Sequence, residues 1–273
     1  MTRSDADAVA VSGALGEPSE RSGRREVRRV ANRDILPRVA AGALAAIASP
    51  ASRRRFAKAL WIQLKRYGAR LENIDIAQLR GVDRVTVEGP VMRMSPLVLA
   101  ALARVLECQT IFEFGTFRGD TAWLLAHNLP RARIFTLDLG GPHAIADAAL
   151  ELTDAEYFET WDRGSRFRGT PEGERITQLL GDSATFDFSR FSGAMDLVFI
   201  DASHSYSYVK SDTEAALRML SETGTIAWDD YTYYPGIFAY LHELAPTLDR
   251  PLYHILGTRL ALYTRRDVIL PPR

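Results

Sequence analysis

The chain of 273 residues carries 34 basic and 34 acidic side chains, and 47% of its residues are hydrophobic by a broad count. Zero net charge gives no global indication of binding to nucleic acid or to a membrane surface, and the length suffices for one sizeable core. The single cysteine, Cys108, excludes an intrachain disulfide and is typical of a reducing compartment. We therefore expect a cytoplasmic protein with Cys108 as a small core residue.

The first part of the chain is more basic than the rest. Residues 1–66 contain 14 Arg and Lys against 6 Asp and Glu, which leaves 20 against 28 for the remainder. Residues 1–34 have few large apolar groups, so a disordered basic arm is predicted. Residues 35–89 should form an accessory helical segment, since apolar residues recur at helical spacing between 56 and 67. No run reaches the roughly 18 apolar residues that would predict a transmembrane helix.

From residue 90 onward, strands and helices alternate, which predicts one α/β domain over residues 90–273. The strands expected are 110–114, 132–139, 176–181, 195–201 and 224–230, with helices near 97–106, 120–128, 209–220 and 237–244. Continuous apolar strands between helices indicate a three-layer, mostly parallel sheet covered on both faces. Two strand-like runs joined at Gly257-Thr258 predict a C-terminal hairpin that adds an antiparallel edge.

The expected strands end in acidic residues. At or directly after five successive strand ends stand Glu113, Asp138, Asp182 with Ser183, Asp201, and Asp229 with Asp230. The carboxyl ends of the strands form the ligand-binding edge of an open α/β sheet. A single carboxylate there is often only a turn former or a helix cap. Five of them favour a ligand that carries positive charge.

The turn after the first of these strands has the glycine spacing Glu113-x-Gly115-x-x-x-Gly119. A dinucleotide site would show Gly-x-Gly-x-x-Gly, because pyrophosphate is bound by backbone N–H groups, and a P-loop would end in Gly-Lys-Ser/Thr. Neither pattern is present in this turn. The ligand expected has a ribose and a base, lacks phosphate and is cationic, and S-adenosylmethionine has these properties.

On the motif EFGTFRG, residues 113–119, followed by an acidic second strand end, the chain resembles the Rossmann-like methyltransferases that use S-adenosylmethionine. The resemblance covers residues 111–263. It implies that Gly115, Thr116 and Gly119 form the turn against the cofactor, with Glu113 at its methionine end.

The same resemblance implies roles at the next two strand ends. Asp138 would accept both ribose hydroxyls, and Asp182 with Ser183 would contact the adenine. The alternative is that these side chains only form turns or caps.

The chemistry is expected after the strand at 195–201. Methyl transfer needs the reactants aligned in line and the proton of the acceptor removed. Asp201, which we also expect to contact the cofactor, lies three residues before His204. An imidazole with a pKa near ~6.5 suits a general base, so we predict Asp201 and His204 as catalytic residues. A helix cap is the alternative for His204.

A subset of these relatives, the cation-dependent O-methyltransferases, holds Mg²⁺ between an aspartate after the fourth strand and an acidic or amide pair after the fifth. Asp201, Asp229 and Asp230 occupy those positions here, and carboxylate oxygens suit this cation. The metal would lower the pKa of the acceptor hydroxyl. Where those relatives often have a lysine, this chain has His204, as in a bacterial branch that methylates sugars and antibiotic-like molecules. The metal therefore stays open.

Taken together, these patterns predict a methyltransferase that transfers the methyl group of S-adenosylmethionine to a small-molecule hydroxyl. The long 140–175 connection, with Tyr157, Trp161 and Arg166, is expected either to recognise the acceptor or to pack on the body. The alternatives are a non-catalytic S-adenosylmethionine-binding protein and, against the glycine spacing, a nicotinamide-dependent oxidoreductase. No nucleic-acid partner is expected, and a homo-oligomer is left open.

Overall fold

The computed structural model describes residues 44, 49, 50, 52–54, 56, 57, 71–89, 94–140, 144, 147–150 and 162–271. The predicted basic arm, 1–34, lies outside these residues, as do Tyr157 and Trp161 of the long connection. Among the described residues, none of the helices combines the length and the apolar character that crossing a bilayer requires.

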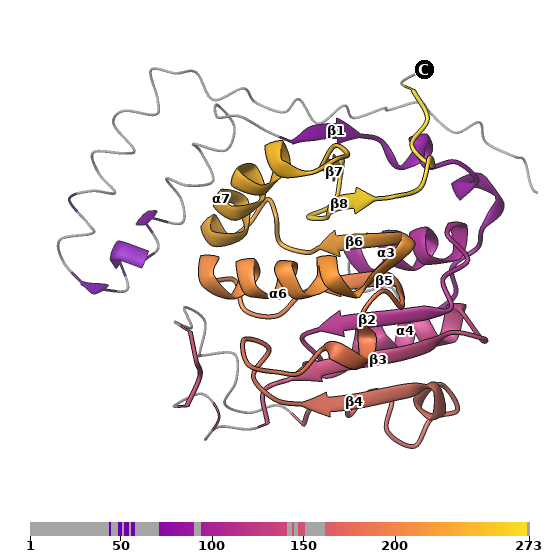
Figure 1. Ribbon diagram of the computed structural model, residues 1–273, viewed down its shortest axis with the longest axis horizontal. Helices are drawn as coiled ribbons and strands as arrows, with labels where there is room; N and C mark the ends of the chain where they lie inside the picture. Colours follow the sequence, from indigo (N-terminus) through magenta and orange to yellow (C-terminus); the bar gives the residue numbers. More distant parts are fainter. Residues whose placement is uncertain are drawn as a thin grey trace, which may run out of the picture.

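Within the described part of the chain, eight strands form one sheet at the centre of the molecule (Figure 1). In spatial order they are β1 (Glu72–Ile74), β7 (Tyr253–Ile255), β8 (Ala261–Thr264), β6 (Leu220–Trp228), β5 (Met195–Ile200), β2 (Thr110–Phe114), β3 (Arg133–Asp138) and β4 (Ile176–Leu180). Strand β8 is antiparallel to both of its neighbours, and the other neighbouring pairs are parallel. This confirms the predicted Rossmann-like α/β sheet with an antiparallel C-terminal hairpin.

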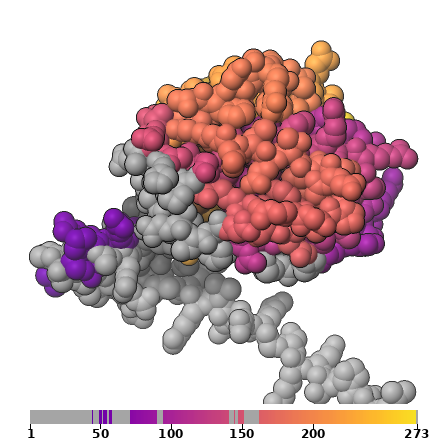
Figure 2. Space-filling view, turned by 90° about the horizontal axis from the view of Figure 1, so that it is seen from below, coloured from indigo at the N-terminus to yellow at the C-terminus, as the bar shows by residue number. Residues whose placement is uncertain are grey.

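Helices cover both faces of the sheet, as three layers require. They are α3 (Met94–Val105), α4 (Asp120–Asn128), α6 (Tyr206–Met219) and α7 (Pro235–Leu244). Helices α6 and α7 lie in front of the sheet in Figure 1, and α3 and α4 lie behind it. The short 3₁₀ turns are Ile76–Gln78, Val82–Arg84, Glu172–Arg175, Ser189–Phe191 and Ala245–Thr247. Segments from the middle of the chain, coloured red to orange, form most of the face seen from below (Figure 2).

The core has one apolar cluster on each side of the sheet. One cluster joins α3 and α4 to the sheet and contains Cys108, a residue that is 1% exposed; burial raises the pKa of its thiol to about 12. The prediction of a small core cysteine is therefore confirmed. The other cluster joins α6 and α7 to the opposite face, where Phe112 and Phe114 of β2 are fully buried. Buried strands of this kind read as continuous apolar runs in the sequence.

Strand β1 was not predicted, because residues 72–74 were assigned to the accessory helical segment. It pairs in parallel with β7 and places one buried side chain, Ile74, against the core. Just before it, the Leu71 N–H donates to Tyr231 Oη at 3.2 Å. Because β1 pairs with the outer side of β7, the C-terminal hairpin of β7 and β8 lies inside the sheet instead of at its edge. The predicted boundaries at residues 34 and 89 remain predictions.

Candidate active site

The turn after β2 needs glycine for contacts inside the chain. Gly115 has φ +94°, and a Cβ there would collide with the backbone of Asp201 at the end of β5. Gly119 has φ +85°, and a Cβ there would lie 2.5 Å from the ring of Phe167. These φ angles favour glycine, and the turn is held by Gly115 N–H donating to Leu137 O at 2.8 Å. Gly115 thus packs the turn against the end of β5, and Gly119 packs the start of α4 against Phe167, in addition to the predicted approach to a cofactor.

Glu113 is buried at the end of β2, where Thr136 bonds to it and Thr116 bonds to Thr136. Thr136 Oγ1 donates to Glu113 Oε2 at 2.6 Å, and Thr116 Oγ1 lies 2.8 Å from Thr136 Oγ1. Burial raises the pKa of Glu113 to about 8; the hydrogen bond from Thr136 lowers it in part, and the charge of Asp138 raises it. Thr136 was missed by the sequence analysis, although it is the cross-strand partner of Glu113 in the β2–β3 register.

Asp138, at the end of β3, contacts the glycine turn that follows β2. Its Oδ2 accepts from the Phe117 N–H at 2.8 Å. Its Oδ1 lies 3.3 Å from Nε of Arg163, a residue that the sequence analysis did not single out. The segment of Arg163 is fastened to the same turn, because the Gly164 N–H donates to Phe117 O at 3.0 Å. The ribose acceptor proposed from the sequence is therefore already paired with an arginine.

Asp182, after β4, has its oxygens engaged by the protein. Tyr208 Oη donates to its Oδ1 at 3.0 Å, the Ala184 N–H donates to the same oxygen at 2.9 Å, and the Ala149 N–H donates to Oδ2 at 2.7 Å. Close by, Asp212 of α6 is fully buried, and burial raises its pKa to about 7; Ser183 lowers this pKa in part, and Asp182 raises it.

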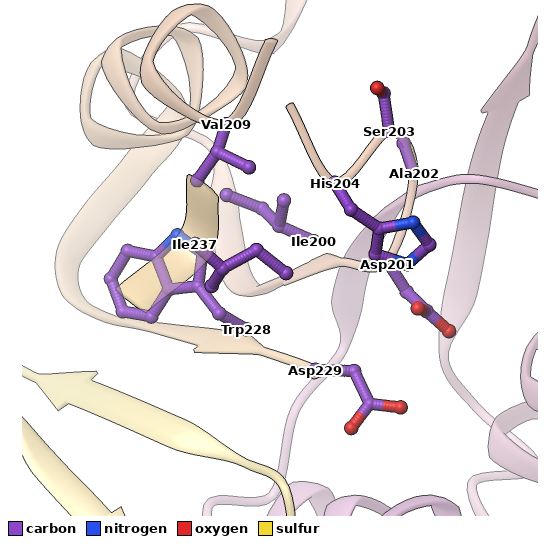
Figure 3. A pocket seen from close by; sticks show the side chains of 9 residues that line it. All are labelled: Ile200, Asp201, Ala202, Ser203, His204, Val209, Trp228, Asp229 and Ile237. Atoms are coloured by element: carbon purple, nitrogen blue, oxygen red, sulfur yellow. The ribbon is translucent and has the colours of Figure 1, made fainter. Parts of the chain in front are cut away.

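The ends of β5 and β6 bring an imidazole and three carboxylates together. His204 Nε2 lies 3.1 Å from Asp230 Oδ2, and the imidazole stacks on Tyr234 with ring centroids 3.8 Å apart. Asp201, His204 and Asp230 each offer one ligand atom within 4.8 Å of the others. Figure 3 shows Asp201 and His204 on the polar side of the pocket, with Asp229 below them, and the apolar side chains opposite.

The charges of this cluster act on one another. Burial raises the pKa of Asp201 well above its ordinary value, and the charges of Asp229 and Asp230 raise it further, while His204 lowers it. The pKa of Asp229 is raised first by burial and then by Asp230, and the guanidinium of Arg259 opposes both effects. Asp201 and Asp229 therefore bind protons more readily than exposed carboxylates do, and a cationic neighbour favours their ionised forms.

Arg259, in the connection from β7 to β8, contacts both carboxylates that follow β6. Its Nη2 lies 2.8 Å from Asp229 Oδ2, and its Nη1 lies 2.5 Å from Asp230 Oδ1. The predicted metal set of Asp201, Asp229 and Asp230 stays a prediction. Asp201, His204 and Asp230 lie close together, and Arg259 contacts both Asp229 and Asp230. Nothing in the local pattern around the Gly257-Thr258 turn indicated this contact.

Comparison with known proteins supports the class of the domain. Residues 112–231, less than half of the chain, match the family model described as a methyltransferase domain. Among functionally curated proteins, none matches this chain in sequence. The sheet confirms the predicted Rossmann-like fold, and the family match supports a methyltransferase domain over residues 112–231.

Three solved structures with a similar arrangement follow. The cofactor-bound protein Rv0187 from MTB is 18% identical, with 70% of this chain and 88% of that chain covered and a TM-score of 0.46. The SAH-bound methyltransferase PaMTH1 from Podospora anserina is 18% identical, with 65% and 80% covered and a TM-score of 0.46. TomG from Streptomyces achromogenes, an O-methyltransferase of tomaymycin synthesis in complex with SAM, is 16% identical, with 78% and 99% covered and a TM-score of 0.43.

Proposed function

We propose that this protein transfers the methyl group of S-adenosylmethionine to a hydroxyl group of a small molecule. The observation that carries the proposal is the row of carboxylates at the ends of adjacent parallel strands. Glu113, Asp138 and Asp201 end β2, β3 and β5, which are neighbours in the sheet. Anionic groups around a glycine turn suit a cationic nucleoside without phosphate.

The binding roles in this proposal follow the strand order. Asp138 accepts the ribose hydroxyls, and Arg163 then shares or releases its Oδ1. Glu113 faces the cationic methionine end, where a positive charge favours the ionised form of its carboxyl group. Asp182, whose oxygens already accept bonds from the protein, shapes the adenine subsite together with Ser183.

The transfer itself is a displacement at the methyl carbon. The oxygen of the acceptor attacks in line, the bond from carbon to sulfur breaks, and S-adenosylhomocysteine leaves. His204 takes the proton of the hydroxyl group. Asp230, 3.1 Å from His204 Nε2, orients the imidazole and stabilises the imidazolium that forms. Asp201 lies beside this pair, where the positive charge of a bound sulfonium would favour the ionised form of its carboxyl group.

Mg²⁺ at Asp201, Asp229 and Asp230 remains a prediction, as do the cytoplasmic location, the absence of a nucleic-acid partner and any homo-oligomer. The donor chemistry of the three carboxylates suits Mg²⁺. The Arg259 guanidinium on Asp229 and Asp230, however, does not fit a divalent ion shared by the same two carboxylates. No step above is therefore assigned to a metal.

The binding role of Asp138 gives the direct test of the proposal. The substitution Asp138→Ala removes the acceptor of two charge-assisted hydrogen bonds, each worth about 1.5–3 kcal/mol. We expect the affinity for S-adenosylmethionine, measured by isothermal titration calorimetry, to fall by at least about 100-fold. The matched control is Asp162→Ala, which removes an exposed carboxylate paired with Arg168. Equal affinities of the wild type and the Asp138 variant would refute the assignment.

A further inference from the structure

The guanidinium of Arg259 occupies the space between the two carboxylates that follow β6. Its two terminal nitrogens contact different residues, Asp229 through Nη2 at 2.8 Å and Asp230 through Nη1. Asp229 is 4% exposed and Asp230 is 6% exposed. A planar fork with a permanent positive charge is the side chain best suited to bridge two buried carboxylates.

The backbone of Arg259 is fixed on both sides. Its N–H donates to Ser95 Oγ of α3 at 3.2 Å, and its carbonyl oxygen accepts from the Tyr231 N–H at 3.0 Å. The second bond ties Arg259 to the residue that directly follows Asp230. These two hydrogen bonds therefore fix the backbone of Arg259 relative to α3 and to the segment that carries Asp229 and Asp230.

The bridge also sets the position of the imidazole. Asp230 uses Oδ1 for Arg259 and Oδ2 for His204, so that one carboxylate joins the guanidinium to the proposed base. Asp230 adopts φ +57°, which is uncommon for a residue with a side chain. The surrounding contacts must hold it in this conformation. His204, after β5, and Arg259, between β7 and β8, both contact its carboxylate.

We propose that Arg259 is a built-in cation that takes the place of a divalent metal between Asp229 and Asp230. Its charge neutralises part of the acidic cluster, keeps Mg²⁺ from bridging this pair and holds Asp230 against His204. Arg259 is thus a positioning residue. This inference goes beyond the proposed function, because it concerns the charge that fills the site and not the reaction.

The test uses Mn²⁺ as the probe for a Mg²⁺ site. The full chain is freed of metal with a chelator, and binding is followed by loss of the electron paramagnetic resonance signal of free Mn²⁺. The substitution Arg259→Gln removes the positive charge and leaves two uncompensated carboxylates. We expect this variant to bind one Mn²⁺ at least about 100-fold more tightly than the wild type, and Arg259→Gln with Asp230→Asn to lose this binding.

The matched control is Arg250→Gln. Arg250 also pairs with a carboxylate, since its Nη1 lies 2.7 Å from Asp267 Oδ1, but this pair is at the surface. The Arg250→Gln variant should bind Mn²⁺ no better than the wild type does. Stoichiometric binding of Mn²⁺ by the wild type, as tight as in the Arg259 variant, would overturn the inference. An Arg259→Gln variant with no higher affinity for Mn²⁺ than the wild type would overturn the inference as well, because Arg259 would then not be the group that excludes the ion.

A second measurement covers the case in which the Arg259→Gln variant does not fold. The guanidinium N–H signals of the wild type are recorded with ¹⁵N-labelled arginine, and Arg259 is assigned through Arg259→Lys. We expect these signals to stay unchanged in a large excess of Mg²⁺. A shift that saturates would show that the ion enters the bridge. Neither measurement needs S-adenosylmethionine, so failure here leaves the test at Asp138 unaffected.

Discussion

Glu113 places a carboxyl group inside an apolar strand, and its hydrogen bond to Thr136 only partly offsets the cost of burial. Its pKa is about 8 in the folded chain against an ordinary 4.5. The folded protein thus retains a proton that the unfolded chain releases. The resulting stabilisation is full below the ordinary pKa and is lost as the pH rises through the folded value. Asp212, with its pKa raised to about 7, contributes in the same direction.

We expect the substitution Glu113→Gln to weaken the dependence of the stability of the protein on pH. Glutamine still offers an oxygen to Thr136 but has no proton to lose. Without cofactor, the melting temperature of the wild type should fall more than that of the variant between about pH 5 and pH 8. Asp162→Asn, at an exposed position, should leave the dependence unchanged. Parallel curves for the wild type and the Glu113 variant would contradict the assignment of the raised pKa.

His204 is the group in the cluster that we assign as the base. The substitution His204→Gln should lower turnover by about 10²–10⁴-fold, the usual contribution of general base catalysis, while the affinity for S-adenosylmethionine stays within a factor of about two. Turnover is measured as release of S-adenosylhomocysteine with a panel of phenolic and sugar hydroxyl acceptors. His127→Gln serves as control, because that histidine pairs with Glu172 away from the cluster. A variant that binds the donor and turns over normally would exclude the role.

The glycine turn after β2 packs against a segment from later in the chain, the one that contains Phe167. Gly119 precedes α4, and its missing side chain leaves room for the ring of Phe167. The segment of Phe167 in turn bonds to the turn, since the Arg166 N–H donates to Arg118 O at 2.9 Å. Close packing of this segment on the turn shapes the edge where the cofactor is proposed to bind.

We expect Gly119→Ala to destabilise the protein more than Gly193→Ala. Both glycines have positive φ, but a Cβ at Gly193 would meet nothing within 4 Å. The control therefore measures only the backbone cost, about 1–2 kcal/mol. The Gly119 variant adds overpacking against Phe167, about 1–3 kcal/mol more in the free energy of unfolding by urea. Equal losses of unfolding free energy in the two variants would contradict this prediction and would mean that Phe167 moves aside without cost.

The whole sheet determines which ligand the folded chain can bind. A ligand that binds only the folded state at a concentration of 100 times its dissociation constant stabilises it by about 2.7 kcal/mol. For a domain of this size we expect S-adenosylmethionine to raise the melting temperature by about 5–10 °C. NADH should produce no shift, because the turn lacks the three-glycine phosphate pattern. A shift of the melting temperature with NADH and none with S-adenosylmethionine would favour the oxidoreductase alternative.

Much of the sheet could be predicted because its strands are buried on both faces. The expected strand 110–114 agrees with β2, and 195–201 agrees with β5 to within one residue. Strand β6 begins at Leu220, earlier than the expected 224, because it follows α6 directly. Strand β1 has three residues and one buried side chain, and its partner β7 lies far along the chain. Such a strand has no periodic pattern of its own.

The sequence by itself determined that carboxylates end successive strands, because local hydrophobic runs mark where each parallel strand stops. Only the tertiary structure decided what each carboxylate touches. Thr136 meets Glu113 through strand register, Arg163 meets Asp138 through a folded-back segment, and Arg259 meets Asp230 through the C-terminal hairpin. These partners come from distant parts of the chain, and hydrophobic periodicity reports local structure but not the pairing of segments far apart in the sequence.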